Sequence, residues 1–101
     1  MTIRREVRVA NVFFAQLDEQ LGTERGPNGE PSATDFIVIE LPSVVEEFAM
    51  AFNELPEALV GVSSVRMFIG TGSLVRAFVV HGIETNTGFV ELVGVDIDLS
   101  L

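Results

Sequence analysis

The sequence predicts an α+β fold in which a two-helix hairpin packs on a mainly antiparallel four-stranded sheet, with the element order β-α-α-β-β-β. Three observations lead to this prediction. Apolar and charged residues alternate at the start of the chain, apolar residues at helical spacing dominate its first half, and three strand-like runs separated by turn residues fill its second half. The 101 residues contain no interdomain linker, so we expect one domain spanning 1–101.

The first two predicted elements are a strand and a helix. Residues 2–10 alternate between apolar and charged side chains, which predicts a strand with one buried face. Asn11 is a suitable N-cap for a helix over 12–21, where apolar residues recur at helical spacing. Gly22 is a natural residue to end that helix.

A second helix is predicted after a loop over residues 22–32, which is rich in glycine and proline. Ser32 and Asp35 have the spacing of a capping box, the side-chain pair that begins many helices. Apolar residues then keep helical spacing as far as Leu55. Pro42 lies inside this stretch and predicts a kink, because proline removes one backbone donor.

Pro42 also leaves a second interpretation open. The β-branched residues of 36–39 favour a strand, and Ser43 followed by Glu46 has the spacing to begin a separate helix after the proline. We favour one kinked helix over this alternative, because the apolar spacing continues through Pro42 without losing phase.

Three further strands are predicted over 65–69, 74–81 and 89–99. The glycine-rich loop 70–73 and the turn 84–88 connect them, so they should form an antiparallel meander. The first strand of the chain is then expected to pair with one of the three, while the helices pack on one face of the sheet.

The composition narrows the classes of function. Fifteen acidic residues face six arginines, with no lysine, which gives a net charge of −9. A chain this acidic is not expected to bind nucleic acid, because nucleic-acid-binding domains carry basic patches. The absence of cysteine predicts no disulfides and no thiolate metal site. Without a signal-peptide pattern or a membrane-spanning apolar run, we expect a cytoplasmic protein.

Several short segments resemble one known group of proteins. These are the hairpin segments Val65-Arg66 and Leu74-Val75-Arg76, the segment Val79-Val80-His81 before a turn, and the closing strand over 90–96. Together with the element order, they make the chain similar to the RelE/ParE superfamily of type II toxins. The resemblance implies an antitoxin-like partner and, in many members, ribosome-dependent cleavage of messenger RNA. This chain lacks the lysines and the tyrosine of those RNases, so the resemblance favours a non-nucleolytic relative.

Arg66, Arg76 and His81 are the only residues that match the positions of the RNase residues, and they are weak candidates for catalysis. If loop 70–73 closes the hairpin, Arg66 lies opposite Ala77 and projects away from Arg76. Arg66 and His81 could then share a face, but they would be offset along the hairpin. Asp96 and Asp98 share a strand face and are expected to be solvated carboxylates. We therefore predict no metal site and no cofactor.

The meander is apolar on both faces, and two helices can cover only one of them. The remaining face should meet a partner protein or a second copy, so we expect a homodimer or a complex. The residues predicted to form this interaction face are Leu74, Phe78, Val80, Val90 and Leu92. A third hypothesis is a ligand-binding domain with an apolar pocket between helices and sheet, lined by Phe36, Phe48, Phe52 and Phe68.

Overall fold

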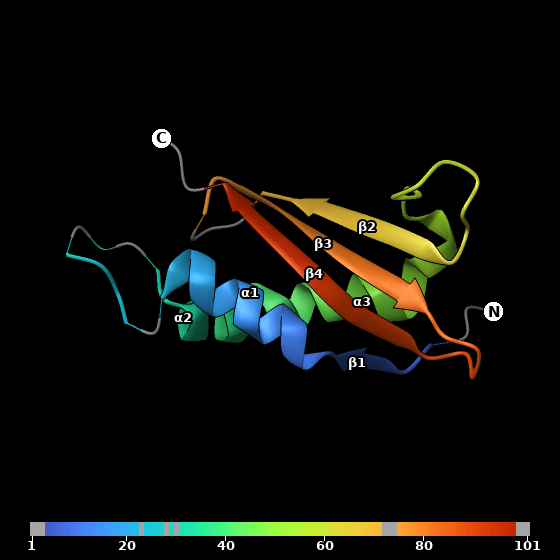
Figure 1. The fold of residues 1–101 in the computed structure, drawn as a ribbon, viewed down its shortest axis with the longest axis horizontal. Helices are drawn as coiled ribbons and strands as arrows, with labels where there is room; N and C mark the ends of the chain where they lie inside the picture. Colours follow the sequence, from blue (N-terminus) through green and yellow to red (C-terminus); the bar gives the residue numbers. More distant parts are fainter. Residues whose placement is uncertain (1–3, 23, 28, 30, 72–74, 99–101) are drawn as a thin grey trace.

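The computed structural model describes residues 4–22, 24–27, 29, 31–71 and 75–98 (Figure 1). The elements in chain order are strand β1 (Val7–Val9), helices α1 (Asn11–Leu21), α2 (Ala33–Ile39) and α3 (Leu41–Ala51), the 3-10 helix η1 (Phe52–Glu54), and strands β2 (Val65–Gly70), β3 (Ala77–Glu84) and β4 (Val90–Asp98). The predicted α+β class and the order of strands and helical regions are confirmed. Among the described residues, no helix is long and apolar enough to cross a membrane.

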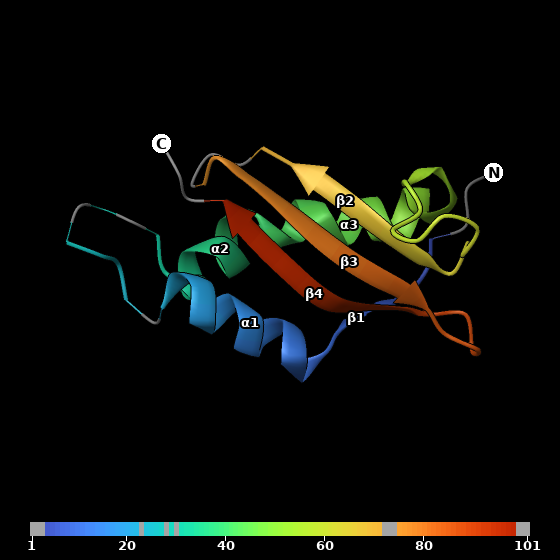
Figure 2. The same ribbon diagram turned by 45° about the horizontal axis from the view of Figure 1, so that its top comes forward.

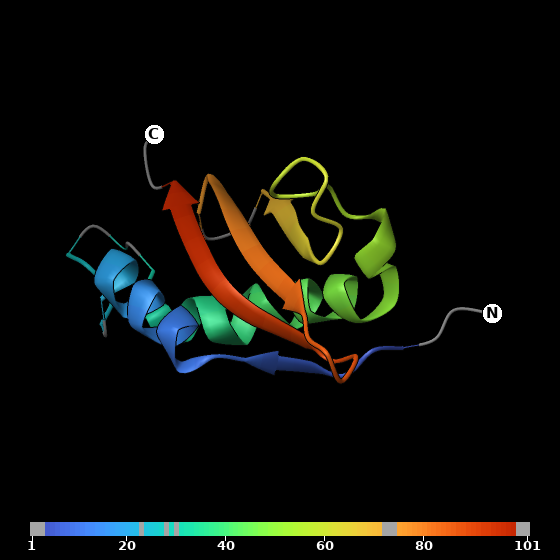
Figure 3. The same ribbon diagram turned by 45° about the vertical axis from the view of Figure 1, so that its right-hand side comes forward.

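The four strands form one sheet in the order β1-β4-β3-β2. β2, β3 and β4 make the predicted antiparallel meander, but β1 runs parallel to β4, so the sheet is mixed. Figure 3 shows the helices together below strands β2, β3 and β4, and Figure 2 looks onto these strands with α3 behind them. One face of the sheet is therefore covered by helices, and the other carries none.

The predicted two-helix hairpin is wrong in its helix count, because the second helical region is divided at Glu40 into α2 and α3. Residues 35–41 are helical rather than extended, apart from Glu40 at the division, which excludes the strand alternative. The amide of Glu40 still donates to Phe36 O at 2.9 Å, and the amide of Val44 donates to Glu40 O at 3.3 Å. Pro42 is tolerated because it lies in the first turn of α3, where its missing N–H is not needed.

The capping box predicted at the start of α2 is present. Asp35 N donates to the Ser32 hydroxyl at 3.2 Å, and Ser32 N donates to the Asp35 carboxylate at 2.9 Å. Arg25 also donates two hydrogen bonds to this carboxylate, at 2.9 and 3.1 Å. The Arg25 guanidinium and then the Ser32 amide lower the pKa of Asp35 to about 2.

At the start of α1, Ala10 is the N-cap, so the predicted role of Asn11 is wrong by one residue.

The core lies between the helices and the inner face of the sheet. Phe13 and Leu17 of α1, Phe36 of α2 and Phe48 of α3 are fully buried and pack over the strands. The Phe48 ring lies directly over Gly82 of β3, where an added Cβ would approach Phe48 to 2.5 Å. Small and large residues therefore face each other across this layer, which lets α3 approach the sheet closely.

A β-bulge decides which side chains of β4 face the core. The pairing of β3 with β4 shifts between His81 and Gly82, so one residue of β4 is left over near Val93. Val90 and Leu92 face the helices before the bulge, and Val95 and Ile97 face them after it. In a regular strand, alternation would place Val95 and Ile97 on the face opposite to Val90 and Leu92, and the bulge is the reason that all four lie on the same face.

Two glutamines of α1 complete the hydrogen bonding of β4. β1 pairs with β4 only as far as Leu92, which leaves the later part of this strand edge without a strand partner. Gln16 Oε1 accepts from Val95 N at 3.0 Å. Gln20 accepts from Ile97 N at 2.7 Å and donates to Val95 O at 2.7 Å. The side-chain amides of α1 thus take the place of a continuing β1.

We expect Gln20→Ala to lower the free energy of unfolding by about 1–3 kcal/mol, because it leaves a buried carbonyl and a strand amide without their partners. Urea denaturation of the wild type and the variant measures this difference. Glu19→Ala is the matched control, because Glu19 is exposed on the same helix. Equal losses in the two variants would contradict the role assigned to Gln20.

The lowered pKa of Asp35 predicts a component of acid sensitivity. Its contribution to stability is complete above the unfolded pKa near 4, and it is lost as pH falls towards about 2. We therefore expect Asp35→Asn to have a lower free energy of unfolding than the wild type at neutral pH. The two free energies should become equal near pH 2, where Asp35 is protonated in the wild type as well. Denaturation at a series of pH values measures this, with Asp18→Asn as the control. Parallel curves for wild type and Asp35→Asn would count against the ion pair.

Candidate functional site

Arg66, one of the three candidate catalytic residues, has a structural role. It lies on β2 opposite Gly82, not opposite Ala77, because the β2–β3 connection is longer than the predicted loop. Its guanidinium donates to Ser63 O and Leu55 O, each at 2.8 Å, and to Asn53 O at 3.3 Å. It also lies 5.7 Å from the centre of the Phe52 ring. Arg66 therefore ties the chain after α3 to the sheet.

The other two candidates do not join Arg66 in one site. Arg76 is exposed and precedes β3. His81 lies in the middle of β3, between Met67 of β2 and Gly94 of β4, with its side chain on the face opposite to that of Arg66. The expectation that Arg66 and His81 could share a face is wrong, because the observed register moves Arg66 by five positions along β3. These three residues do not converge on one phosphate.

The structure places the predicted interaction residues on the covered face. Phe78 is 5% exposed, while Val80, Val90 and Leu92 are fully buried. Leu74 lies outside the described residues. Phe78 packs edge to face on Phe36, with ring centres 5.1 Å apart. These four side chains are part of the core and are not available to a partner in this fold.

The face without helices carries a second apolar set, from β2 and β3, which we call the open face. Its side chains alternate with the buried residues of the same strands, and the register places them side by side. The open face consists of six apolar residues and one histidine: Val65, Met67, Ile69, Ala77, Val79, Ile83 and His81. Ile69 is 60% exposed, and the others are half-buried by their neighbours. The inference of an uncovered apolar face therefore points to a different set of residues.

A loop over 58–63 adjoins the beginning of β2 (Figure 1) and exposes three more apolar side chains. Leu59 is 59%, Val60 100% and Val62 38% exposed. Gly61 turns the loop at a φ of 84°, and its amide donates to Glu57 Oε1 at 3.2 Å. Further backbone hydrogen bonds join this loop to β2, from Ala58 N to Val65 O at 3.0 Å and from Val65 N to Val62 O at 3.4 Å.

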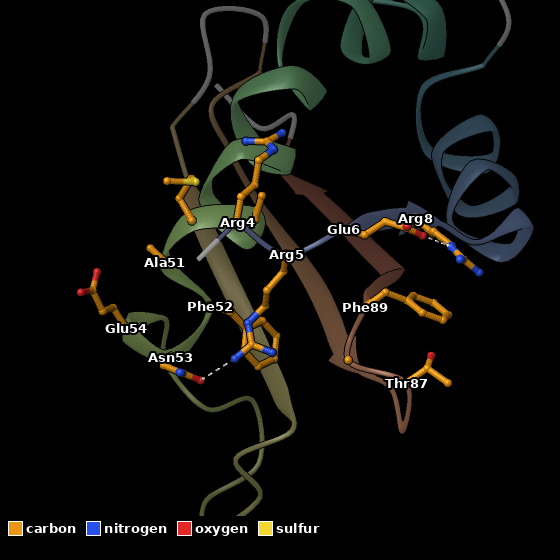
Figure 4. A pocket seen from close by; sticks show the side chains of 13 residues that line it. Arg4, Arg5, Glu6, Arg8, Ala51, Phe52, Asn53, Glu54, Thr87 and Phe89 are labelled. Carbon is orange, nitrogen blue, oxygen red and sulfur yellow. Dashed lines mark hydrogen bonds and ion pairs between the residues drawn. The ribbon is translucent and has the colours of Figure 1, made fainter. Parts of the chain in front are cut away.

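A cavity of about 800 Å³ lies between the chain before β1, the end of α3 and the β3–β4 turn (Figure 4). Arg4, Arg5 and Arg8 contribute to its lining, together with Phe52 and Phe89. The volume lies in the range of small-molecule sites, and the sequence analysis did not predict it. The alternation of residues 2–10 indicated only a strand with one buried face, with no sign of a cavity beside its arginines.

The arginines of this cavity already hold carboxylates of the chain. Arg4 pairs with Glu46, Arg5 with Glu84 and Arg8 with Glu6. The guanidinium of Arg5 also lies 5.1 Å from the centre of the Phe52 ring, and that of Arg8 lies 4.0 Å from the centre of the Phe89 ring.

An anionic ligand would have to displace these carboxylates next to the negative end of α3, the helix whose last residues line the cavity. The cavity is therefore poorly suited to an anion. Among the described residues, no group of three or more histidine, aspartate or glutamate side chains could hold a metal ion.

Comparison of the chain with models of known protein families, with curated proteins and with solved structures finds no match.

The phenylalanines predicted to line a ligand pocket contribute to the core or pack against it. Phe36 and Phe48 are fully buried, Phe52 is 2% exposed, and Phe68 packs on Phe78 with ring centres 6.0 Å apart. Eight phenylalanines in a short chain signal a large aromatic core, and that signal was available in the sequence. What the sequence could not show is how closely the rings pack between the helices and the sheet.

The contacts of Arg66 predict that its loss affects stability rather than chemistry. We expect Arg66→Ala to lower the free energy of unfolding by about 2 kcal/mol, because three carbonyl groups lose a charged donor. Arg76→Ala should change it by less than about 0.5 kcal/mol, since Arg76 is exposed. Thermal denaturation tests both. Cleavage of messenger RNA by the wild type that Arg66→Ala abolishes without unfolding the protein would refute the structural role.

Proposed function

We propose that this chain is a non-catalytic protein-interaction domain that binds a partner protein or a second copy of itself through the open face. The observation that carries the proposal is the apolar character of β2 and β3 on the side that no helix covers. Contiguous exposed apolar surface of this kind is typical of interaction sites in soluble proteins. The loop over 58–63 extends the apolar surface beyond the sheet through the exposed side chains of Leu59, Val60 and Val62.

The same observations bear on the enzyme hypothesis. Arg66 is engaged by backbone carbonyls, and His81 lies on the other face of the sheet. A degenerate RNase would need cationic groups and an acid–base pair around one phosphate. This arrangement favours a non-nucleolytic relative of the RelE/ParE superfamily, acting in the cytoplasm with an antitoxin-like or other protein partner. The net charge of −9 likewise disfavours nucleic acid as the partner.

Light scattering at micromolar concentration tests the self-binding form of this proposal. We expect the isolated protein to form a dimer or a larger species, because no helix of the described part of the chain covers the open face. The double variant Met67→Asp with Val79→Asp should be a folded monomer of 11.0 kDa, because both side chains lie on that face.

Val38→Asp is the matched control, since Val38 is an exposed apolar residue of α2, in the helical layer. This substitution should leave the association unchanged. A wild type that stays monomeric would contradict self-binding. Association that survives the double substitution would contradict the use of the open face.

A further inference from the structure

A row of carboxylates borders the open face along β4. Glu91 lies beside Ile83 in the sheet register, Asp96 beside Val79 and Asp98 beside Ala77. Paired residues in neighbouring strands place their side chains on the same face, so these three carboxylates lie next to the apolar residues of the open face. We call Glu91, Asp96 and Asp98 the acidic row. Asp96 and Asp98 are exposed and Glu91 is half-buried.

Asp96 and Asp98 of the acidic row meet apolar residues of the open face in a hollow of about 210 Å³ near one end of the sheet. Ile69, Ala77 and Val79 contribute apolar lining, and Asp96 and Asp98 contribute carboxylates. Asp98 has an interaction of its own within the chain, so the argument uses Asp96. The hollow therefore combines an apolar lining with negative charge beside it.

We propose that this hollow receives a lysine or arginine side chain of a basic protein partner that docks on the open face. Long basic side chains bury their aliphatic stem against apolar surface while the charged head stays at a polar border. Ile69 and Val79 would contact the stem, and Asp96 would accept hydrogen bonds from the head. This inference rests on the proposed function and names the chemistry of the occupant.

Charge favours this occupant over a second copy. Each copy carries a net charge of −9, so two copies repel each other before their apolar faces meet. A basic partner can cover the apolar residues of the open face and pair with the acidic row, so we expect it to displace a second copy.

The test uses three synthetic amphipathic helical peptides with the same leucine ridge, flanked on one side by lysine, glutamine or glutamate. Calorimetric titration should show that the lysine peptide binds about tenfold more tightly than the glutamine peptide at low salt, and that the glutamate peptide binds most weakly. Asp96→Asn should remove most of the lysine advantage without changing the affinity for the glutamine peptide. Asp18→Asn, an exposed change on α1, should change neither.

The salt dependence of binding distinguishes a basic partner from a second copy. Added salt should weaken binding of the lysine peptide and strengthen self-association, because it screens attraction in one case and repulsion in the other. Equal affinities for the lysine and glutamine peptides, or no effect of Asp96→Asn, would overturn the inference. If the lysine and glutamine peptides bind the wild type equally but do not bind the Met67→Asp, Val79→Asp variant, the open face remains the interaction surface. Failure of every peptide to bind also overturns the inference, and light scattering of the protein alone then decides the proposed function.

Discussion

The amides of Gln16 and Gln20 hold α1 along the part of β4 that β1 does not reach, and the arrangement of the layers depends on this contact. β1 is only three residues long, so the strand edge beyond Leu92 would otherwise leave buried backbone groups without partners. Because the two glutamines lie four residues apart, one helical face reaches successive strand positions. With α1 fixed at this edge, Phe13 and Leu17 lie over the inner face, and none of the described helices lies on the open face.

The strands themselves were predictable from alternation and turn residues, whereas the faces they present were not. A β-bulge adds one residue without leaving a mark in composition, yet it moves Val95 and Ile97 to the side of the helices. The register of β2 and β3 depended on the length of their connection, and the glycines of 70–73 suggested a shorter one. The sequence therefore indicated an uncovered apolar face, while the side chains on it required the structure.

The candidate residues show a similar division. Arg66 was singled out by its residue type, which suits either charge stabilisation or the capping of carbonyl groups. Only the contacts of its guanidinium with carbonyl groups at the end of η1 distinguish the two roles. The secondary structure before Pro42 was open to two interpretations, because a helix and a strand over 36–39 differ mainly in their tertiary packing. Phe36 resolves it, since helical geometry lets this ring meet Phe78 in the core.

The acidity of the chain has a physical consequence that composition alone does not give. Arg4, Arg5, Arg8 and Arg25 are each paired with a carboxylate within the chain, so these cations are not directed at a partner. The negative charge that is left is spread over the surface and includes the acidic row along one border of the open face. For the basic partner proposed above, such a field would increase the rate of arrival, while the apolar residues of the open face would supply the contact area that slows dissociation. The two properties act on different steps of one binding event, so the open face can be selective for charge and still draw its affinity from apolar contact.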